Sequence, residues 1–217
     1  VIWYQGENNT NRAKEYYHLF PAMINDWRKK WGKDFPFYWV QLANYMDVVE
    51  VPSESLWAQV REAQTQTLSL SHTGQAVIID IGEAKDIHPK NKQEVGRRLA
   101  LHALHNDYGF SDVVCESPMP KTVRRVQDKI VVQFDNVADG LIVKNKYGYL
   151  MSFAVAGNDG VYKWVQAKVA GKDRVVLSCP DVIDPVSVRY AWGDNPDDAN
   201  LYNSVGLPAT PFEIKIE

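Results

Sequence analysis

The stretch QAVIIDIG, Gln75 to Gly82, is an apolar run in which Asp80 is the single charged residue. A run of this kind is typical of a strand in a parallel sheet that is covered on both faces, because neither side of the strand meets water. The segment KDIHPKNK, Lys85 to Lys92, follows after two residues and contains a proline. We therefore expect a buried parallel strand with a polar loop at its carboxyl end.

Further strands and helices are predicted on both sides of this run. Apolar runs predict strands at VIWYQG (1–6) and FPFYWVQL (35–42), and the polar NNTN (8–11) is expected to cap a helix. Apolar residues that recur every three or four positions predict helices over 12–31, 54–70 and 91–108. Strand and helix thus alternate, which is the signature of parallel α/β architecture.

The pattern changes after about Asp112. SPMPKT (117–122) is rich in turn residues and is expected to be a linker. Beyond it come short alternating segments such as KIVVQF, MSFAVAG and RVVLSC, separated by Gly, Asn, Asp and Pro. Such spacing is typical of a β-sandwich-like module. The sequence therefore predicts an α/β domain over 1–112 and a β-rich domain over 113–217.

Composition excludes several classes of protein. The chain has 217 residues and a formal net charge of -3, and it lacks a long basic run, so no nucleic-acid partner is expected. No apolar window is long enough to span a membrane. Cys115 and Cys179 lack metal-type spacing and are either a disulfide or two buried thiols. The first residues resemble the middle of a core strand, so we expect the protein to begin upstream of Val1.

The segment DIHP places two polar side chains where a site would form. Sites in parallel sheets lie at the carboxyl ends of the strands. In extended backbone Asp86 and His88 point to one side while Ile87 points into packing, and Pro89 favours that backbone. A carboxylate beside an imidazole fixes the tautomer and frees the other nitrogen to accept a proton. Asp86 and His88 are therefore the candidate catalytic pair, with a solvated surface loop as the alternative.

The segment QGENN follows the first predicted strand. Gln5 and Gly6 offer N–H donors of the kind that stabilise an oxyanion in acyl transfer. Glu7 either holds this loop or is a carboxylate favoured by the start of a helix. Gln5, Gly6 and Glu7 are therefore candidates for oxyanion or substrate contacts.

Other polar residues have weaker claims. Arg61 and Gln64 lie three apart on a predicted helix and either contact the substrate or belong to an exposed face, and Asn44 ends the second long strand. Asp80 is an alternative partner for the histidine. His102 and His105 are also three apart, but no third ligand is spaced to join them, so no metal site is expected.

Five segments together resemble the sialate O-acetylesterase family, a branch of the SGNH hydrolases that removes acetyl esters from sugars. They are IWYQGENN, PFYWVQLANY, LWAQVREAQ, AVIIDIGEAKDIHPKNKQEVGRRLALHAL and VRYAWGDNPDDANLYNSVGLPATPFEIK. The match covers nearly the whole chain. It implies a partial flavodoxin-like three-layer domain followed by a β-sandwich-like domain, and a Ser-His-Asp hydrolase that needs neither a cofactor nor a metal.

Within that resemblance His88 is the general base and Asp86 orients it, although many SGNH enzymes space the pair as DxxH rather than DxH. The family's nucleophilic serine lies in a Gly-Gln-Ser-Asn-like block, and no serine of this chain has such a context. We therefore expect the serine in a missing amino-terminal part of the same protein, and little activity from the chain alone.

The resemblance further implies an acetylated sugar as substrate and a secreted or periplasmic location. An exposed sheet edge would also permit a homo-oligomer. Two alternatives differ in class: a carbohydrate-binding protein that kept the scaffold and lost catalysis, and a stable proteolytic fragment. Trp192 and Tyr202 either pack the β-rich module onto the catalytic domain or stack on a sugar.

Overall fold

The first half of the chain is layered because successive side chains of one short strand pack on opposite faces of its sheet. In the computed structural model, which describes residues 1–217, the parallel sheet has the order β1 (Ile2–Trp3), β2 (Phe37–Val40), β3 (Thr73–Ala76). Phe37 and Trp39 of β2 pack into one apolar cluster, whereas Tyr38 and Val40 pack into another. Because successive side chains of a strand point to opposite faces, the sheet is covered on both sides.

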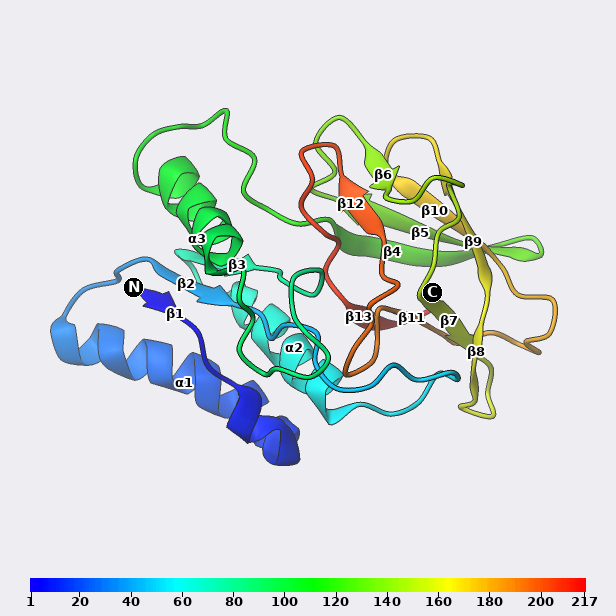
Figure 1. Cartoon of the computed structure of the whole chain (residues 1–217), viewed down its shortest axis with the longest axis horizontal. Helices are drawn as coiled ribbons and strands as arrows, with labels where there is room; N and C mark the ends of the chain where they lie inside the picture. The colour runs from blue at the N-terminus through cyan, green and yellow to red at the C-terminus, as the bar shows by residue number, and fades with distance from the viewer. The chain divides into compact units, whose positions relative to one another are not determined.

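Helices supply the two outer layers. They are α1 (Ala13–Trp31), α2 (Leu56–Gln66) and α3 (Lys92–Asn106), with short 3₁₀-helices η1 (Glu7–Arg12) and η2 (Thr67–Ser69). Residues of α1 and α2 pack on the Phe37 side of β2, and residues of α3 pack on the Tyr38 side. Figure 1 shows α3 on one side of the sheet and α1 with α2 on the other. The predicted three-layer α/β arrangement is confirmed.

Local sequence explains where these helices begin and end. The side chain of Ser55 accepts a hydrogen bond from the Ala58 N–H at 2.9 Å and caps α2, and Asn91 caps α3 in the same way. Gly32 ends α1 in the left-handed conformation that glycine adopts without strain. The NNTN segment, which was expected to cap α1, instead lies within the 3₁₀-helix η1.

The strand predicted over 75–82 is shorter than expected. Its ladder ends at Ala76, although Val77, Ile78 and Ile79 remain buried. Two contacts explain this early end. The guanidinium of Arg98 donates to the carbonyl of Val77 at 2.6 Å, and the N–H of Ile81 donates to the carbonyl of Ile78 at 3.3 Å, which turns the chain.

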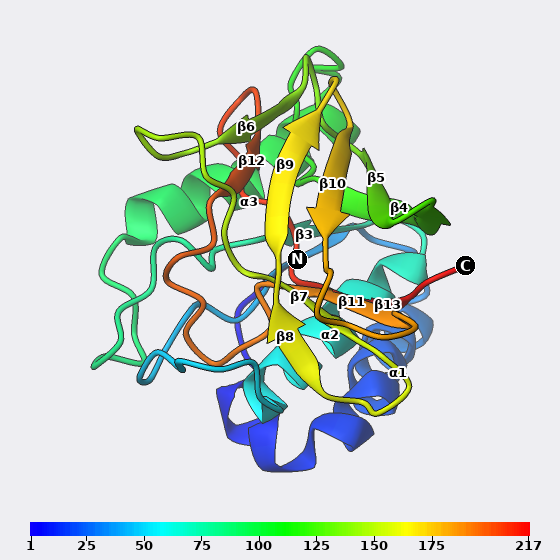
Figure 2. The same cartoon turned by 90° about the vertical axis from the view of Figure 1, so that its right-hand side faces the viewer.

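The second half of the chain is built from antiparallel strands. One sheet has the order β4 (Met119–Val126), β5 (Lys129–Asp135), β10 (Arg174–Ser178), β9 (Gln166–Ala170). A second has the order β13 (Phe212–Lys215), β11 (Ser187–Tyr190), β7 (Phe153–Ala156), β8 (Tyr162–Trp164), and β6 (Leu141–Val143) pairs with β12 (Leu201–Asn203). Figure 2 shows β9 and β10 facing the viewer.

Aromatic side chains join the two larger sheets. The rings of Phe134 in β5 and Phe212 in β13 lie 6.0 Å apart, and Phe212 also contacts Phe153 and Tyr190. Burial of these rings supplies much of the apolar core of this half. The predicted β-rich character is thus confirmed, but SPMPKT is not a linker throughout, because β4 begins at Met119.

The chain divides into two compact units, each made of two separate stretches of the sequence. Residues 1–46 and 55–116 form the first unit, and residues 47–54 and 117–217 form the second. The 47–54 segment is tied to the second unit by side chains: the indole N–H of Trp164 donates to the Glu50 carbonyl at 2.9 Å, and Arg189 pairs with Glu54 at 2.6 Å. No helix in either unit is long and apolar enough to cross a membrane.

Candidate active site

The carboxyl ends of the three parallel strands carry the polar segments that the sequence singled out. The loop after β1 carries Gln5, Gly6 and Glu7, the chain after β2 carries Asn44, and the loop that follows β3 carries the DIHP segment. Because the strands are parallel, these segments emerge at one edge of the sheet. This is the edge at which α/β folds place their sites.

Asp86 and His88 lie together on their loop. An Asp86 carboxylate oxygen is 3.8 Å from Nδ1 of His88, and the same oxygen accepts the main-chain N–H of His88 at 2.9 Å. Ile87 points into packing against the apolar cluster of α1 and α2, as the sequence predicted. The carboxylate therefore faces the Nδ1 side of an imidazole whose side chain is 84% exposed, which leaves Nε2 for proton transfer.

A groove borders this pair. It has a volume of about 360 Å³ and is lined by Tyr4, Gln5, Glu7 and Asn8 from the segment after β1, together with Ile87, His88 and Lys92. The structure thus brings His88 and the QGENN segment to the walls of one groove. A molecule that entered it would meet the imidazole and the amide of Gln5.

Gln5 is held firmly in this wall, and the buried Gly6 follows it. One N–H of the Gln5 amide donates to Asn9 at 2.6 Å, and its oxygen accepts from the Tyr16 hydroxyl at 3.1 Å, so a second N–H is left for a ligand. Gly6 has a φ of 148°, where side chains are strained, and an added Cβ would lie 3.2 Å from Nε2 of Gln64. Burial raises the pKa of Tyr16 to about 12, so its hydroxyl stays a donor.

Gln64 and Arg61 lie behind the wall, and neither lines the groove. Both side chains are fully buried in α2. Gln64 donates to the Gln5 carbonyl at 3.2 Å, while Arg61 donates to the Leu42 and Ala43 carbonyls at 2.8 and 2.7 Å. Their contacts hold the ends of β1 and β2, and a role for either residue in substrate binding stays a prediction.

Asn44 joins two of the strand-end segments. Its side-chain oxygen accepts the N–H of Gly82 at 2.7 Å. Gly82 packs so closely that an added Cβ would lie 2.2 Å from the Asn44 carbonyl oxygen. Asn44 therefore fixes the start of the loop that carries Asp86 and His88, and contact with a substrate stays a prediction.

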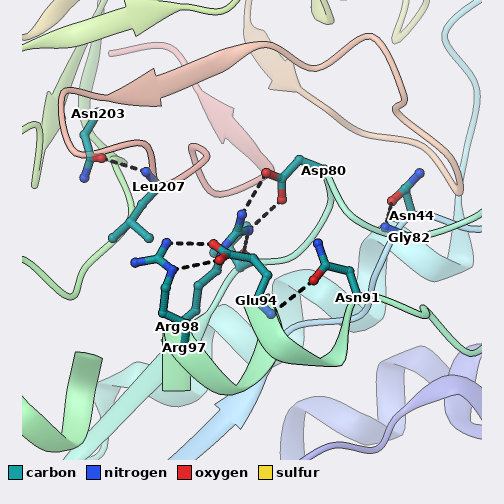
Figure 3. A network of polar contacts seen from close by, with 10 residues as sticks. Asn44, Asp80, Gly82, Asn91, Glu94, Arg97, Arg98, Asn203 and Leu207 are labelled. Carbon is teal, nitrogen blue, oxygen red and sulfur yellow. Dashed lines mark hydrogen bonds and ion pairs between the residues drawn. The ribbon is translucent and has the colours of Figure 1, made fainter. Parts of the chain in front are cut away.

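Asp80 is not the partner of the histidine. Its two carboxylate oxygens accept from the Arg98 guanidinium at 2.6 and 2.9 Å (Figure 3). Arg98 also contacts Glu94 at 2.8 Å, and Arg97 binds the same Glu94 from the exposed side. The hydrogen bond from Arg97, with help from Arg98, lowers the pKa of Glu94 to about 2. This network fastens α3 to the end of β3.

The two helical histidines have different surroundings, and neither belongs to a metal-type cluster. His102 is buried, stacks on Tyr38 with ring centroids 5.6 Å apart, and has Nε2 3.0 Å from the Gln75 carbonyl oxygen. Nδ1 of His105 lies 2.8 Å from the Val113 carbonyl oxygen. No group of three histidine, cysteine or carboxylate side chains lies close enough to hold a metal ion.

Sequence reasoning did not single out Lys92 and Tyr4 of the groove. The ammonium of Lys92 lies 4.9 Å from the centre of the Tyr4 ring, and burial followed by the charge of Glu7 raises the pKa of that phenol. Lys92 opens α3, where the helix dipole disfavours a cation. A lysine at the second position of the helix predicted over 91–108, beside DIHP, was the signal that could have found it.

Known proteins resemble this chain in sequence. Residues 1–105 match the family described as carbohydrate esterase, sialic acid-specific acetylesterase. Sialate O-acetylesterases of Pongo abelii and Homo sapiens are each 30% identical over 240 residues, which cover 98% of this chain and 45% of theirs. That of Mus musculus is 29% identical over all of this chain and 44% of its own length.

A solved structure extends the likeness to the fold. The crystal structure of a carbohydrate acetylesterase from Xanthomonas citri superposes with a TM-score of 0.91 at 45% identity, over 99% of this chain and 50% of that one. The chain spans about half the length of the relatives it matches. Residues 1–105 match the carbohydrate esterase family of sialic acid-specific acetylesterases, which confirms the resemblance drawn from the sequence.

Proposed function

We propose that this chain is part of an esterase that removes acetyl groups from sugars of the sialic acid type by a Ser-His-Asp mechanism. The observation that carries the proposal is His88, with Asp86 beside it, on the wall of a groove that also presents Gln5 and Glu7. The family of residues 1–105 and the named relatives support the same chemistry. Such a substrate favours a secreted or periplasmic enzyme.

His88 would act as general base and then as general acid. A serine hydroxyl attacks the acetyl carbonyl carbon while Nε2 of His88 takes its proton, and Asp86 stabilises the imidazolium. The tetrahedral intermediate collapses, the sugar hydroxyl leaves with that proton, and an acetyl-enzyme remains. Water activated by His88 then releases acetate. The N–H groups of Gln5 and Gly6 are the proposed donors to the developing oxyanion.

The serine is proposed to come from outside these 217 residues. No serine lines the groove beside His88. The serines of the first unit have other places: Ser55 caps α2, Ser69 ends η2, Ser71 contacts Asp34, and Ser111 follows α3. Since the chain spans about half of its relatives, a further segment of the protein has room for the nucleophile.

Acetate release from an O-acetylated sialic acid tests this proposal. The 217-residue chain alone is expected to show no turnover that depends on one of its own serines, whereas the complete protein turns over and loses activity when His88 is replaced. Turnover by the chain that disappears on replacing one of its serines would refute the external nucleophile. A complete protein that binds the sugar without releasing acetate would instead indicate a carbohydrate-binding protein.

A further inference from the structure

An exposed tryptophan of the second unit is held in a fixed orientation. Trp164 ends β8, the edge strand of its sheet, and is 43% exposed. Its indole N–H donates to the Glu50 carbonyl at 2.9 Å, so the side chain is anchored while much of its surface meets solvent. A pre-ordered aromatic surface binds a ligand at low entropic cost, because few rotamers remain to be frozen.

Two pockets of the second unit share this tryptophan. The smaller, of about 160 Å³, is lined by Trp164, Val48, Val49, Ser152, Trp192 and Asp198 among others. The larger, of about 460 Å³, is lined by Trp164, Lys163, Gln166, Ser178, Pro180 and Asp181 among others. We call Trp164 and these two pockets the Trp164 platform. It offers concave space for more than one ring of an extended ligand.

The smaller pocket combines apolar surface with hydrogen-bonding groups. The Ser152 hydroxyl donates to Asp198, whose carboxylate keeps further lone pairs for hydroxyl donors. The indole N–H of Trp192 is buried in the pocket lining and has no hydrogen-bond partner. A buried donor without an acceptor calls for an explanation, and a ligand oxygen that reaches it supplies one. Tryptophan faces and hydroxyl-binding groups together match the two surfaces of a sugar.

The charges that line the two pockets favour a neutral sugar over an acidic one. The smaller pocket is lined by two acidic residues, Glu50 and Asp198, and by no lysine or arginine. In the larger pocket the ammonium of Lys163 already donates to the Asp181 carbonyl at 2.8 Å. A carboxylated sugar would meet repulsion from the two acidic side chains, whereas a neutral sugar can donate its hydroxyls to them.

We propose that the Trp164 platform is a binding site for neutral oligosaccharides. The site is separate from the Asp86–His88 groove, since every residue that lines it belongs to the second unit. It goes beyond the proposed esterase function: binding there needs no acetyl group and no serine. Such a site would hold an unacetylated stretch of a glycan.

NMR titration of the chain with cellohexaose, xylohexaose, mannohexaose and the acidic trisaccharide sialyllactose tests the proposal. We expect at least one neutral hexasaccharide to bind. Added sialyllactose should not displace it. Trp164→Ala should weaken that binding about tenfold or more, the loss of one stacked indole, while Trp164→Phe should retain part of it. Trp31, on α1 and 74% exposed, is a matched control, and Trp31→Ala should bind like the original chain.

Folding is monitored in the same samples by melting temperature. Should Trp164→Ala fail to fold, Asp198→Asn tests the same pocket, with severalfold weaker binding expected. The proposal is overturned if no neutral hexasaccharide binds at millimolar concentration, if folded Trp164→Ala binds as tightly as Trp31→Ala, or if sialyllactose binds more tightly than the neutral sugars. None of these outcomes depends on acetate release, so failure here leaves the esterase proposal standing.

Discussion

Asp86 is positioned by the backbone of His88 rather than by its ring, since a carboxylate oxygen accepts the His88 N–H at 2.9 Å and lies 3.8 Å from Nδ1. The turn itself therefore sets the carboxylate beside the imidazole. The ring is exposed and can close the remaining distance when a substrate arrives, as catalytic hydrogen bonds often do.

Replacement of His88 should abolish the proposed proton transfer. His88→Asn in the complete enzyme is expected to lower kcat for acetyl release by about 10²-fold to 10⁴-fold, the range of general-base catalysis, with little change in melting temperature because the side chain is exposed. His72 and Asp34 form a second exposed pair, 3.2 Å apart, as a matched control. An equal loss in His72→Asn would remove His88 from the mechanism.

Asp86→Asn tests the charge of the Asp86 side chain while its position is kept. The asparagine oxygen can still accept the His88 N–H, so the turn should persist, but the negative charge that stabilises the imidazolium is lost. We expect a substantial fall in kcat and an unchanged KM, with Asp86→Ala lower still and less stable. Equal kcat in Asp86→Asn and the original enzyme would show that the carboxylate has no electrostatic role.

Arg98 and Arg97 share Glu94 but differ in burial, with side chains 5% and 47% exposed. Arg98→Ala should lower the free energy of unfolding by about 3–5 kcal/mol, because it removes the buried ion pair with Asp80 and the donor to the Val77 carbonyl. Arg97→Ala should cost about 1 kcal/mol or less. Urea unfolding measures the loss of stability in both variants. Losses of similar size would contradict the conclusion that the buried Arg98 contributes more than the exposed Arg97.

Gly74 leaves room for a buried ring. An added Cβ would lie 2.5 Å from Nδ1 of His102, whose ring is packed and cannot move aside easily. Gly74→Ala should therefore destabilise the protein by about 1–3 kcal/mol. Gly96 in α3 has nothing within 4 Å of an added Cβ, so Gly96→Ala should stabilise by about 1 kcal/mol. Thermal unfolding would disprove the steric argument if Gly74→Ala were neutral.

Burial of His102 predicts that stability falls with acid. Burial lowers the pKa of its imidazole below the ordinary 6.5. Between these two pKa values, His102 is protonated in the unfolded chain and neutral in the folded chain. The free energy of unfolding should therefore decrease as pH falls from 6.5 toward the lowered pKa. His102→Gln should flatten the curve in that range, as followed by urea unfolding at several pH values. An unchanged slope would exclude His102 as its source.

Glu94 acts at lower pH. Since its folded pKa is about 2 and its ordinary value 4.5, the carboxylate stabilises the folded state above 4.5 and this contribution is lost as pH falls toward 2. Glu94→Gln should show less loss of stability between pH 4.5 and 2 than the original chain. A loss of equal size would place the effect in other carboxylates.

The layers of the first unit could be predicted because periodic burial is local. Apolar spacing in α1 and α3, and the apolar runs at β2 and directly after β3, indicate two covered faces without knowledge of any contact. The end of β3 could not be predicted, since it depends on Arg98, 21 positions away, which takes the Val77 carbonyl. The same distant arginine removes Asp80 from the candidate partners of His88.

The start of β4 shows a different limit. Pro118 and Pro120 favoured a linker, but β4 is the edge strand of its sheet, and the register shifts between Pro120 and Thr122. An edge strand tolerates a proline because its missing N–H faces no partner, and edge position is a property of the assembled sheet. Of the candidate site, the Asp86–His88 pair was local enough to predict, whereas Lys92 over Tyr4 required the fold.

The passage of residues 47–54 into the second unit has a practical consequence for dissecting the protein. A truncation that starts near Ser117 would produce the sandwich strands without the main-chain oxygen that steadies Trp164 and without Glu54, one of the two carboxylates that pair with Arg189. Expression of that piece would thus leave the buried Arg189 with Glu213 as its remaining paired carboxylate, and any glycan assay on it would probe a disturbed surface. An expression fragment of the second unit therefore has to include residues 47–54, although these residues lie within the sequence of the first unit.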